Sequence, residues 1–148
     1  MSHWSPSVVL AHSTCDCVYH IVFCPKYRKK IIFGQLKVHI GRILSKLLEE
    51  LWVEKLEWNL RADHVHLVLR ISPKFAVSNV VWALKWKAAI RIHNQFSKNR
   101  NKLTSKHFWS RWYFVRTTGL DLEIVRKYVQ NQEQDDKQTD GNQQDFGF

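Results

Sequence analysis

Polar and apolar positions along the chain switch between a period of two and a helical period, and these switches divide the sequence into elements. Residues 18–24 are almost all β-branched or aromatic, which predicts a buried first strand that ends at Pro25. Apolar residues at helical spacing over 36–51 predict an amphipathic helix with its charged positions outside the apolar stripe. The first third of the chain is therefore expected to form a strand followed by a helix.

The middle of the chain alternates with a period of two in two adjacent segments. From Val53 onward we expect one apolar face, made by Leu56, Trp58 and Leu60. A second alternation covers residues 63–71, and the short link between the two segments predicts an antiparallel hairpin.

Helical spacing over residues 77–92 predicts a second long helix, and residues 113–118 predict a fourth strand. Asp121 is suited to cap a final helix over residues 122–132. The order β-α-β-β-α-β followed by a helix predicts an α+β fold, a ferredoxin-like sandwich. In that fold a four-stranded antiparallel sheet carries both long helices on one face.

The length of 148 residues fits one domain, which we place at residues 18–133. Residues 1–17 lack clear periodicity and are expected to form an N-terminal arm. Residues 134–148 are rich in Gln, Asp, Asn and Gly and are expected to be a disordered tail.

The charge balance points to a polyanionic partner. The 23 Lys and Arg residues outnumber the 13 Asp and Glu residues, giving a formal charge of +10. Nucleic acid is favoured over a membrane, since no apolar run approaches the roughly 20 residues of a spanning helix. The first residues also lack the pattern of a signal peptide, so we expect a cytoplasmic protein.

His64 and His66 are the first candidates for chemistry. They lie two residues apart, so a strand places both imidazoles on one face, opposite Val65 and Leu67. Two such imidazoles can bind one divalent ion when a third group arrives from elsewhere in the fold. The alternative is a pair of polar residues on a solvated strand face. If both helices cover the opposite face, the pair lies on a platform suited to single-stranded nucleic acid or phosphate chemistry.

Tyr128 and Gln132 are four residues apart on the expected final helix, hence on one side of it. A tyrosine hydroxyl can attack a phosphodiester and form a covalent phosphotyrosine, which keeps the bond energy for a later rejoining step. The alternative is that Tyr128 packs in the core and Gln132 is solvated at the helix end.

The order of these motifs resembles one family over most of the chain. The segments that carry the resemblance are 19–23 (Tyr-His-Ile-Val-Phe), 25–28 (Pro-Lys-Tyr-Arg), 63–66 (Asp-His-Val-His), 77–90, 113–115 (Tyr-Phe-Val) and 128–132. They are similar to the single-tyrosine HUH transposases of small bacterial and archaeal insertion sequences, to which the REP-associated tyrosine transposases are related. HUH denotes His, hydrophobic residue, His.

The resemblance implies a metal-dependent DNA strand transferase. It implies that His64, His66 and Gln132 bind Mg or Mn and that Tyr128 is the nucleophile. Such enzymes cut and rejoin single-stranded DNA through a 5′-phosphotyrosine and a free 3′-OH. They recognise hairpins near the element ends and work as homodimers, in which the tyrosine helix of one subunit completes the histidine site of the other.

Basic residues on the loop after the first strand and on the second long helix are the candidate DNA contacts: Lys26, Arg28, Lys29, Lys30, Lys85, Lys87 and Arg91. A solvated face is the alternative for each of them. The alternative function is a non-catalytic relative that only binds single-stranded or hairpin nucleic acid.

Four tryptophans depart from the family pattern, in which glycine is expected at Trp52, Trp82, Trp86 and Trp112. Trp52 follows the first helix, where a glycine with positive φ commonly ends a helix. If buried, such rings would overfill close contacts at a cost of about 1–3 kcal/mol each, and we expect impaired folding or activity. The alternative is that the rings are exposed and can stack on bases.

Overall fold

The computed structural model describes residues 8–10, 13–96, 108–118, 127 and 130 of the chain. Two short strands come first, β1 (Val8–Leu10) and β2 (Ser13–Cys15). The remaining elements follow in the order β3 (Val18–Pro25), η1 (Lys26–Arg28), α1 (Gly34–Glu50), β4 (Glu54–Leu60), β5 (Val65–Arg70), α2 (Val77–Phe96) and β6 (Trp109–Thr117).

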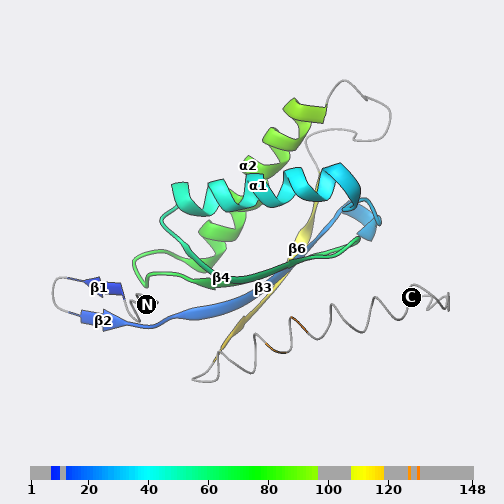
Figure 1. Ribbon diagram of the computed structural model, residues 1–148. Helices are drawn as coiled ribbons and strands as arrows, with labels where there is room; N and C mark the ends of the chain where they lie inside the picture. Colours follow the sequence, from blue (N-terminus) through cyan, green and yellow to red (C-terminus); the bar gives the residue numbers. More distant parts are fainter. Residues whose placement is uncertain (1–7, 11–12, 97–107, 119–126, 128–129, 131–148) are drawn as a thin grey trace, which may run out of the picture.

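The larger sheet has four strands in the order β4-β5-β3-β6, and every neighbouring pair is antiparallel. Helices α1 and α2 lie on the same side of this sheet, which leaves its other side uncovered by any described helix (Figure 1). This arrangement confirms the predicted α+β ferredoxin-like sandwich. Of the final helix expected over residues 122–132 the structure describes only residues 127 and 130, and the expected tail at 134–148 lies outside the described residues.

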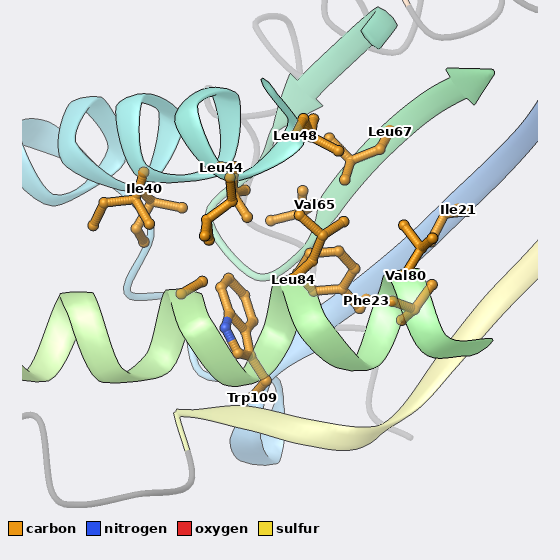
Figure 2. Close-up of a cluster of buried hydrophobic side chains, with 14 of the residues drawn as sticks. Ile21, Phe23, Ile40, Leu44, Leu48, Val65, Leu67, Val80, Leu84 and Trp109 are labelled. Atoms are coloured by element: carbon orange, nitrogen blue, oxygen red, sulfur yellow. The ribbon is translucent and has the colours of Figure 1, made fainter. Parts of the chain in front are cut away.

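The main core fills the space between the sheet and the two helices (Figure 2). Because side chains alternate along a strand, Ile21 and Phe23 of β3 point into this core, as do Val65, Leu67 and Leu69 of β5. Phe23 is fully buried and meets Trp109 edge to face, with ring centroids 4.8 Å apart. The alternate residues of the central strands lie on the side without a described helix, where His66, Val68 and Arg70 of β5 are nevertheless buried.

Strand β4 departs from the predicted alternation at Leu56. The pairing with β5 shifts register between Lys55 and Glu57, as in a β-bulge. Trp58 and Leu60 pack on the main core, whereas Leu56 packs with Val68 in a small cluster on the other side of the sheet. The expectation that Leu56 shares a face with Trp58 was therefore wrong, because the extra residue in the bulge reverses the alternation.

The segment before the sheet also contains more structure than its sequence pattern predicted. Strands β1 and β2 pair antiparallel, with Val8 opposite Cys15 and Leu10 opposite Ser13. Only three residues of each strand take part, which is too short a run for a period of two to stand out in the sequence.

Helix α1 ends in the geometry that normally requires glycine. The Val53 N–H donates to the Leu48 carbonyl at 3.0 Å, and the Trp52 N–H donates to the Glu49 carbonyl at 3.1 Å. This pair of bonds is a Schellman motif, with Trp52 at the left-handed position. The φ of Trp52 is 56°, as its place after the helix predicted, and its side chain is 88% exposed. The unfavourable feature of Trp52 is therefore its backbone conformation and not crowding.

Replacing Trp52 with glycine is expected to stabilise the fold by about 1 kcal/mol, because glycine adopts the left-handed conformation without a Cβ clash. Trp82→Gly is the matched control, since Trp82 is also exposed but lies inside α2, where glycine costs roughly 0.5–1 kcal/mol. Urea unfolding of both variants would reveal opposite shifts in midpoint. Shifts of the same sign would show that removing an exposed indole, and not the backbone, dominates.

The other three departures from glycine are exposed as well. Trp82, Trp86 and Trp112 are 65%, 50% and 60% exposed, so their rings do not overfill the core. The expectation that these rings crowd close contacts was wrong, because each points away from the packed layer. Trp82 and Trp86 instead stack on each other along α2, with centroids 6.0 Å apart and planes 5° from parallel.

Candidate metal and DNA-processing site on the open sheet face

The uncovered side of the sheet gathers three histidines. His66 lies on the central strand β5 and His20 on its neighbour β3, while His64 lies in the turn just before β5. The backbone of this turn is closed by a 2.8 Å bond from the Arg61 N–H to the His64 carbonyl. The structure thus brings His64 and His66 together as predicted, with ring centroids 4.6 Å apart and planes at 72°.

His64 is held by the residue before it. Its Nδ1 lies 2.5 Å from Oδ1 of Asp63, and Asp63 in turn receives the guanidinium of Arg28 at 3.4 Å. The hydrogen bond from His64 lowers the pKa of the Asp63 carboxyl, so this carboxylate is charged at neutral pH. Arg28 reaches it from η1, where Tyr27 and Arg28 both have positive φ. The chain Arg28–Asp63–His64 directs the second ring nitrogen of His64, Nε2, away from its own carboxylate partner.

His66 is held by a residue from another strand. Its Nδ1 lies 3.0 Å from Nε2 of His20, and the two rings are almost parallel, with centroids 5.3 Å apart. His66 is only 7% exposed, and its buried Nε2 has no hydrogen-bond partner among the described residues. Because most buried polar atoms in folded proteins have a hydrogen-bond partner, this nitrogen is a candidate position for binding a ligand.

Burial keeps the imidazoles of the central strands neutral. It lowers the pKa of His66 to about 3, and the nearby imidazoles of His64 and His20 lower this pKa further. Burial and, secondarily, the charge of Arg116 lower the pKa of His20. A neutral imidazole is the form that binds a metal, so no proton has to be displaced from His66 near neutral pH.

These donors fit a divalent metal. His64 and His66 each have Nδ1 engaged, by Asp63 in one case and by His20 in the other, which leaves Nε2 as the candidate ligand atom. Within the described ranges, no three His, Cys, Asp or Glu side chains are grouped so as to hold a metal by themselves. The third ligand implied by the resemblance is a glutamine amide, a residue type outside this set. Gln132, predicted for this role, and the predicted nucleophile Tyr128 both lie outside the described residues.

The predicted DNA contacts fall into two separate groups. Lys26, Arg28, Lys29 and Lys30 are exposed at and after η1, and Arg28 joins this loop directly to Asp63 beside the histidines. Residues of α2 instead lie beyond the sheet, on its helix-covered side. The basic loop therefore remains the set of candidate contacts nearest to the site.

The basic residues of α2 differ in the hydrogen bonds that hold their side chains. Lys85 donates through Nζ to the backbone oxygens of Arg111 and Trp112 at 3.1 and 3.3 Å, and burial lowers its pKa. Arg91 donates through Nη2 to both carboxylate oxygens of Glu50, at 3.0 and 2.8 Å. Lys87 is exposed. A role of these residues in binding DNA stays a prediction.

The model of the family described as "Transposase IS200 like" matches residues 13–132 of the chain. The chain belongs to this family. The matched range includes every residue predicted for the metal and nucleophile positions, whose roles stay predictions.

Curated relatives agree with this assignment. The chain is 39% identical over 128 residues to the transposase of insertion sequence element IS200 from Salmonella typhimurium, covering 86% of this chain and 84% of that protein. It is 28% identical over 115 residues to the ISDra2 transposase TnpA of Deinococcus radiodurans, covering 77% of this chain and 82% of the relative.

Solved structures share the fold of this IS200-like transposase. The crystal structure of a candidate transposase from Deinococcus radiodurans R1 superposes with a TM-score of 0.67 at 22% identity, covering 84% of this chain and 98% of that one. A REP-associated tyrosine transposase bound to a REP hairpin superposes with a TM-score of 0.56 at 11% identity, covering 83% and 68%. In the described part of this transposase, no helix has the length and apolarity needed to cross a membrane.

Sequence reasoning missed two residues that the geometry places in the site. Asp63 and His20 appear in the motifs that resemble the family, but their contacts with the HUH imidazoles were not predicted. Asp63 could have been found from its position next to His64. His20 could not, since it is 46 residues from His66 and only the pairing of β3 with β5 brings them together.

Proposed function

We propose that this transposase cleaves and rejoins single-stranded DNA at hairpin-marked element ends through a covalent 5′-phosphotyrosine on Tyr128. The observation that carries the proposal is the pair of HUH imidazoles, each fixed at Nδ1 and each leaving Nε2 for a ligand on the open face of the sheet. A site that binds nucleic acid without reaction does not need an imidazole nitrogen that is buried and has no partner in the described part of the chain.

The proposed reaction consists of two transfers at one phosphorus atom. The hydroxyl oxygen of Tyr128 attacks the scissile phosphate and loses its proton, and the bond from phosphorus to the 3′-oxygen breaks. The 3′-oxygen takes up a proton, which gives a free 3′-OH and leaves the 5′-phosphate on the tyrosine. A second 3′-OH then attacks this phosphorus and releases Tyr128, which completes the rejoining without hydrolysis.

In this proposal His64, His66 and Gln132 hold Mg or Mn. The bound ion would neutralise charge on the phosphate and orient it for in-line attack. Asp63 and Arg28 fix the direction of His64, so the ligand pair is arranged before DNA arrives.

The proposed substrate is single-stranded DNA with hairpins, bound by a homodimer. The +10 formal charge of the chain suits a DNA partner, and a structural neighbour is bound to a REP hairpin. In the proposed dimer the tyrosine helix of one subunit completes the histidine site of the other. The proposal also includes contacts between DNA and the basic residues on η1, the loop after it and α2.

The test is to incubate the protein with single-stranded hairpin DNA and Mn²⁺ or Mg²⁺, then separate the products on a denaturing gel. A covalent protein–DNA adduct and a shorter strand with a free 3′-OH are expected, and both should disappear with a chelator. Binding of hairpins by the folded protein without any adduct, across hairpin substrates, would instead favour the non-catalytic binding module.

A further inference from the structure

His20 contacts His66 directly on the sheet face that carries the predicted metal ligands. It belongs to β3 and lies one cross-strand step from His66, because Val22 is opposite His66 and Val68 is opposite His20. Side chains at such diagonal positions are close enough for aromatic rings to meet. The two rings are nearly parallel, with an angle of 9° between their planes, and Nε2 of His20 lies 3.0 Å from Nδ1 of His66.

A single proton must lie between these two ring nitrogens, because a neutral imidazole has one N–H and one lone pair. If His20 donated this proton, His66 would carry its own proton on Nε2. That N–H would be a buried donor without an acceptor among the described residues, and it could not bind a cation. If His66 donates from Nδ1 instead, its Nε2 carries a lone pair.

We infer that His20 is a positioning residue that accepts the Nδ1 proton of His66 and thereby presents the Nε2 lone pair of His66 to the metal. The inference rests on the proposed metal site. Metal-binding histidines almost always donate their other ring N–H to a neighbouring acceptor, which fixes both tautomer and ring direction. His20 supplies that acceptor for His66, as Asp63 does for His64.

The surroundings of His20 hold its ring in place for this role. Phe114 of β6 meets it edge to face with centroids 6.3 Å apart. On β6, Arg116 is directly opposite His20 in the strand pairing. The ring is thus fixed between two strands, which limits its rotation away from His66.

The tautomer can be measured without any metal or DNA. Nitrogen-15 NMR of the histidine rings, with chelator present, should show His66 protonated on Nδ1 in the wild-type protein. In His20→Phe, which keeps a planar ring but has no acceptor, His66 should shift toward the Nε2-protonated form. Protonation of His66 on Nε2 in the wild-type protein would overturn the inference, even if no variant folds.

Metal affinity provides the second readout. Calorimetric titration with Mn²⁺ alone should give a dissociation constant about 10–100-fold weaker for His20→Phe, the range typical for loss of a partner behind a metal ligand. His20→Gln should recover most of the affinity, because its amide oxygen can accept the same proton. His39→Phe is the matched control: His39 lies on α1, packs against Phe96, and should leave Mn²⁺ binding unchanged.

The outcomes separate the inference from the proposed function. If wild-type protein binds Mn²⁺, His66→Ala does not, and His20→Phe binds as tightly as wild type, then the role of His20 is wrong while the metal site stands. If neither wild type nor any variant binds Mn²⁺, the proposed metal site itself is wrong. Equal weakening by His20→Phe and His39→Phe would indicate general destabilisation and would also overturn the inference.

Discussion

Tyr128→Phe is expected to abolish the covalent protein–DNA adduct. Phenylalanine keeps the ring but lacks the hydroxyl that would attack the phosphate, so no bond to phosphorus can form. The loss should be complete on a denaturing gel, whereas hairpin binding in a native gel should stay close to wild type. Lys127→Ala, a neighbouring exposed residue, is the control and should still form the adduct. An adduct that survives in Tyr128→Phe would assign the nucleophile to another residue.

Mixing two inactive variants tests where the tyrosine acts. His64→Ala removes one imidazole of the HUH pair and should also abolish cleavage, because loss of Lewis-acid stabilisation worth several kcal/mol slows the reaction at least about 1000-fold. If the site is shared between subunits, Tyr128→Phe mixed with His64→Ala should regain cleavage. The reason is that one hybrid site then contains intact histidines from one subunit and an intact tyrosine from the other. Absence of any recovery in confirmed mixed dimers would place the whole site in one chain.

Phe23→Ala is expected to cost about 3–5 kcal/mol of folding free energy. Phe23 is fully buried on the covered side of β3, and its ring meets Trp109 of β6 edge to face (Figure 2). Removing the ring loses the free energy gained by burying it, and the cavity left behind costs further packing contacts. Against a typical stability of about 5–15 kcal/mol, this change should bring the protein near the limit of folding.

The matched control is Phe33→Ala, because Phe33 is 66% exposed at the start of α1. Its truncation should change stability by no more than about 0.5 kcal/mol. Urea denaturation followed by circular dichroism measures both variants. Similar losses for the two would contradict the assignment of Phe23 to the core, and a small loss for Phe23→Ala alone would show that β6 and α2 close over the gap.

Local patterning predicted the architecture well. The alternation over residues 63–71 and the helical stripes over 36–51 and 77–92 predicted one strand and two helices, and the structure has β5, α1 and α2 at these places. The prediction failed at Leu56, where a bulge changes the face of the strand, and at the β1–β2 hairpin. Both failures have the same cause. A bulge and a three-residue pairing both depend on the partner strand, so neither produces a clear periodic pattern in the sequence.

For the tryptophans, too, the sequence predicted the local backbone conformation but not the burial of the side chains. The sequence correctly placed Trp52 at a left-handed helix end, because the position follows directly from where the apolar stripe stops. It could not tell whether the rings of Trp82, Trp86 and Trp112 are buried. Exposure depends on which side of α2 or β6 meets the core, and the structure turns all three outward.

For the site, the sequence by itself determined which groups are available: two imidazoles two residues apart, a carboxylate beside the first, and a basic chain suited to DNA. The strand expected from residue 63 begins at Val65, so His64 lies in the turn before β5 and not on the strand. The motif order also led to the transposase family, which the family match confirms. The roles of Tyr128 and Gln132 remain predictions.

Only the tertiary structure decided how the two imidazoles are held. Asp63 is next to His64 in the sequence, so local geometry suffices for that contact, whereas His20 reaches His66 across 46 residues through the β3–β5 register. Such register is fixed by burial of Ile21, Phe23, Val65 and Leu67 on the far face. The packing of apolar residues on one side of the sheet therefore sets which histidines meet on the other.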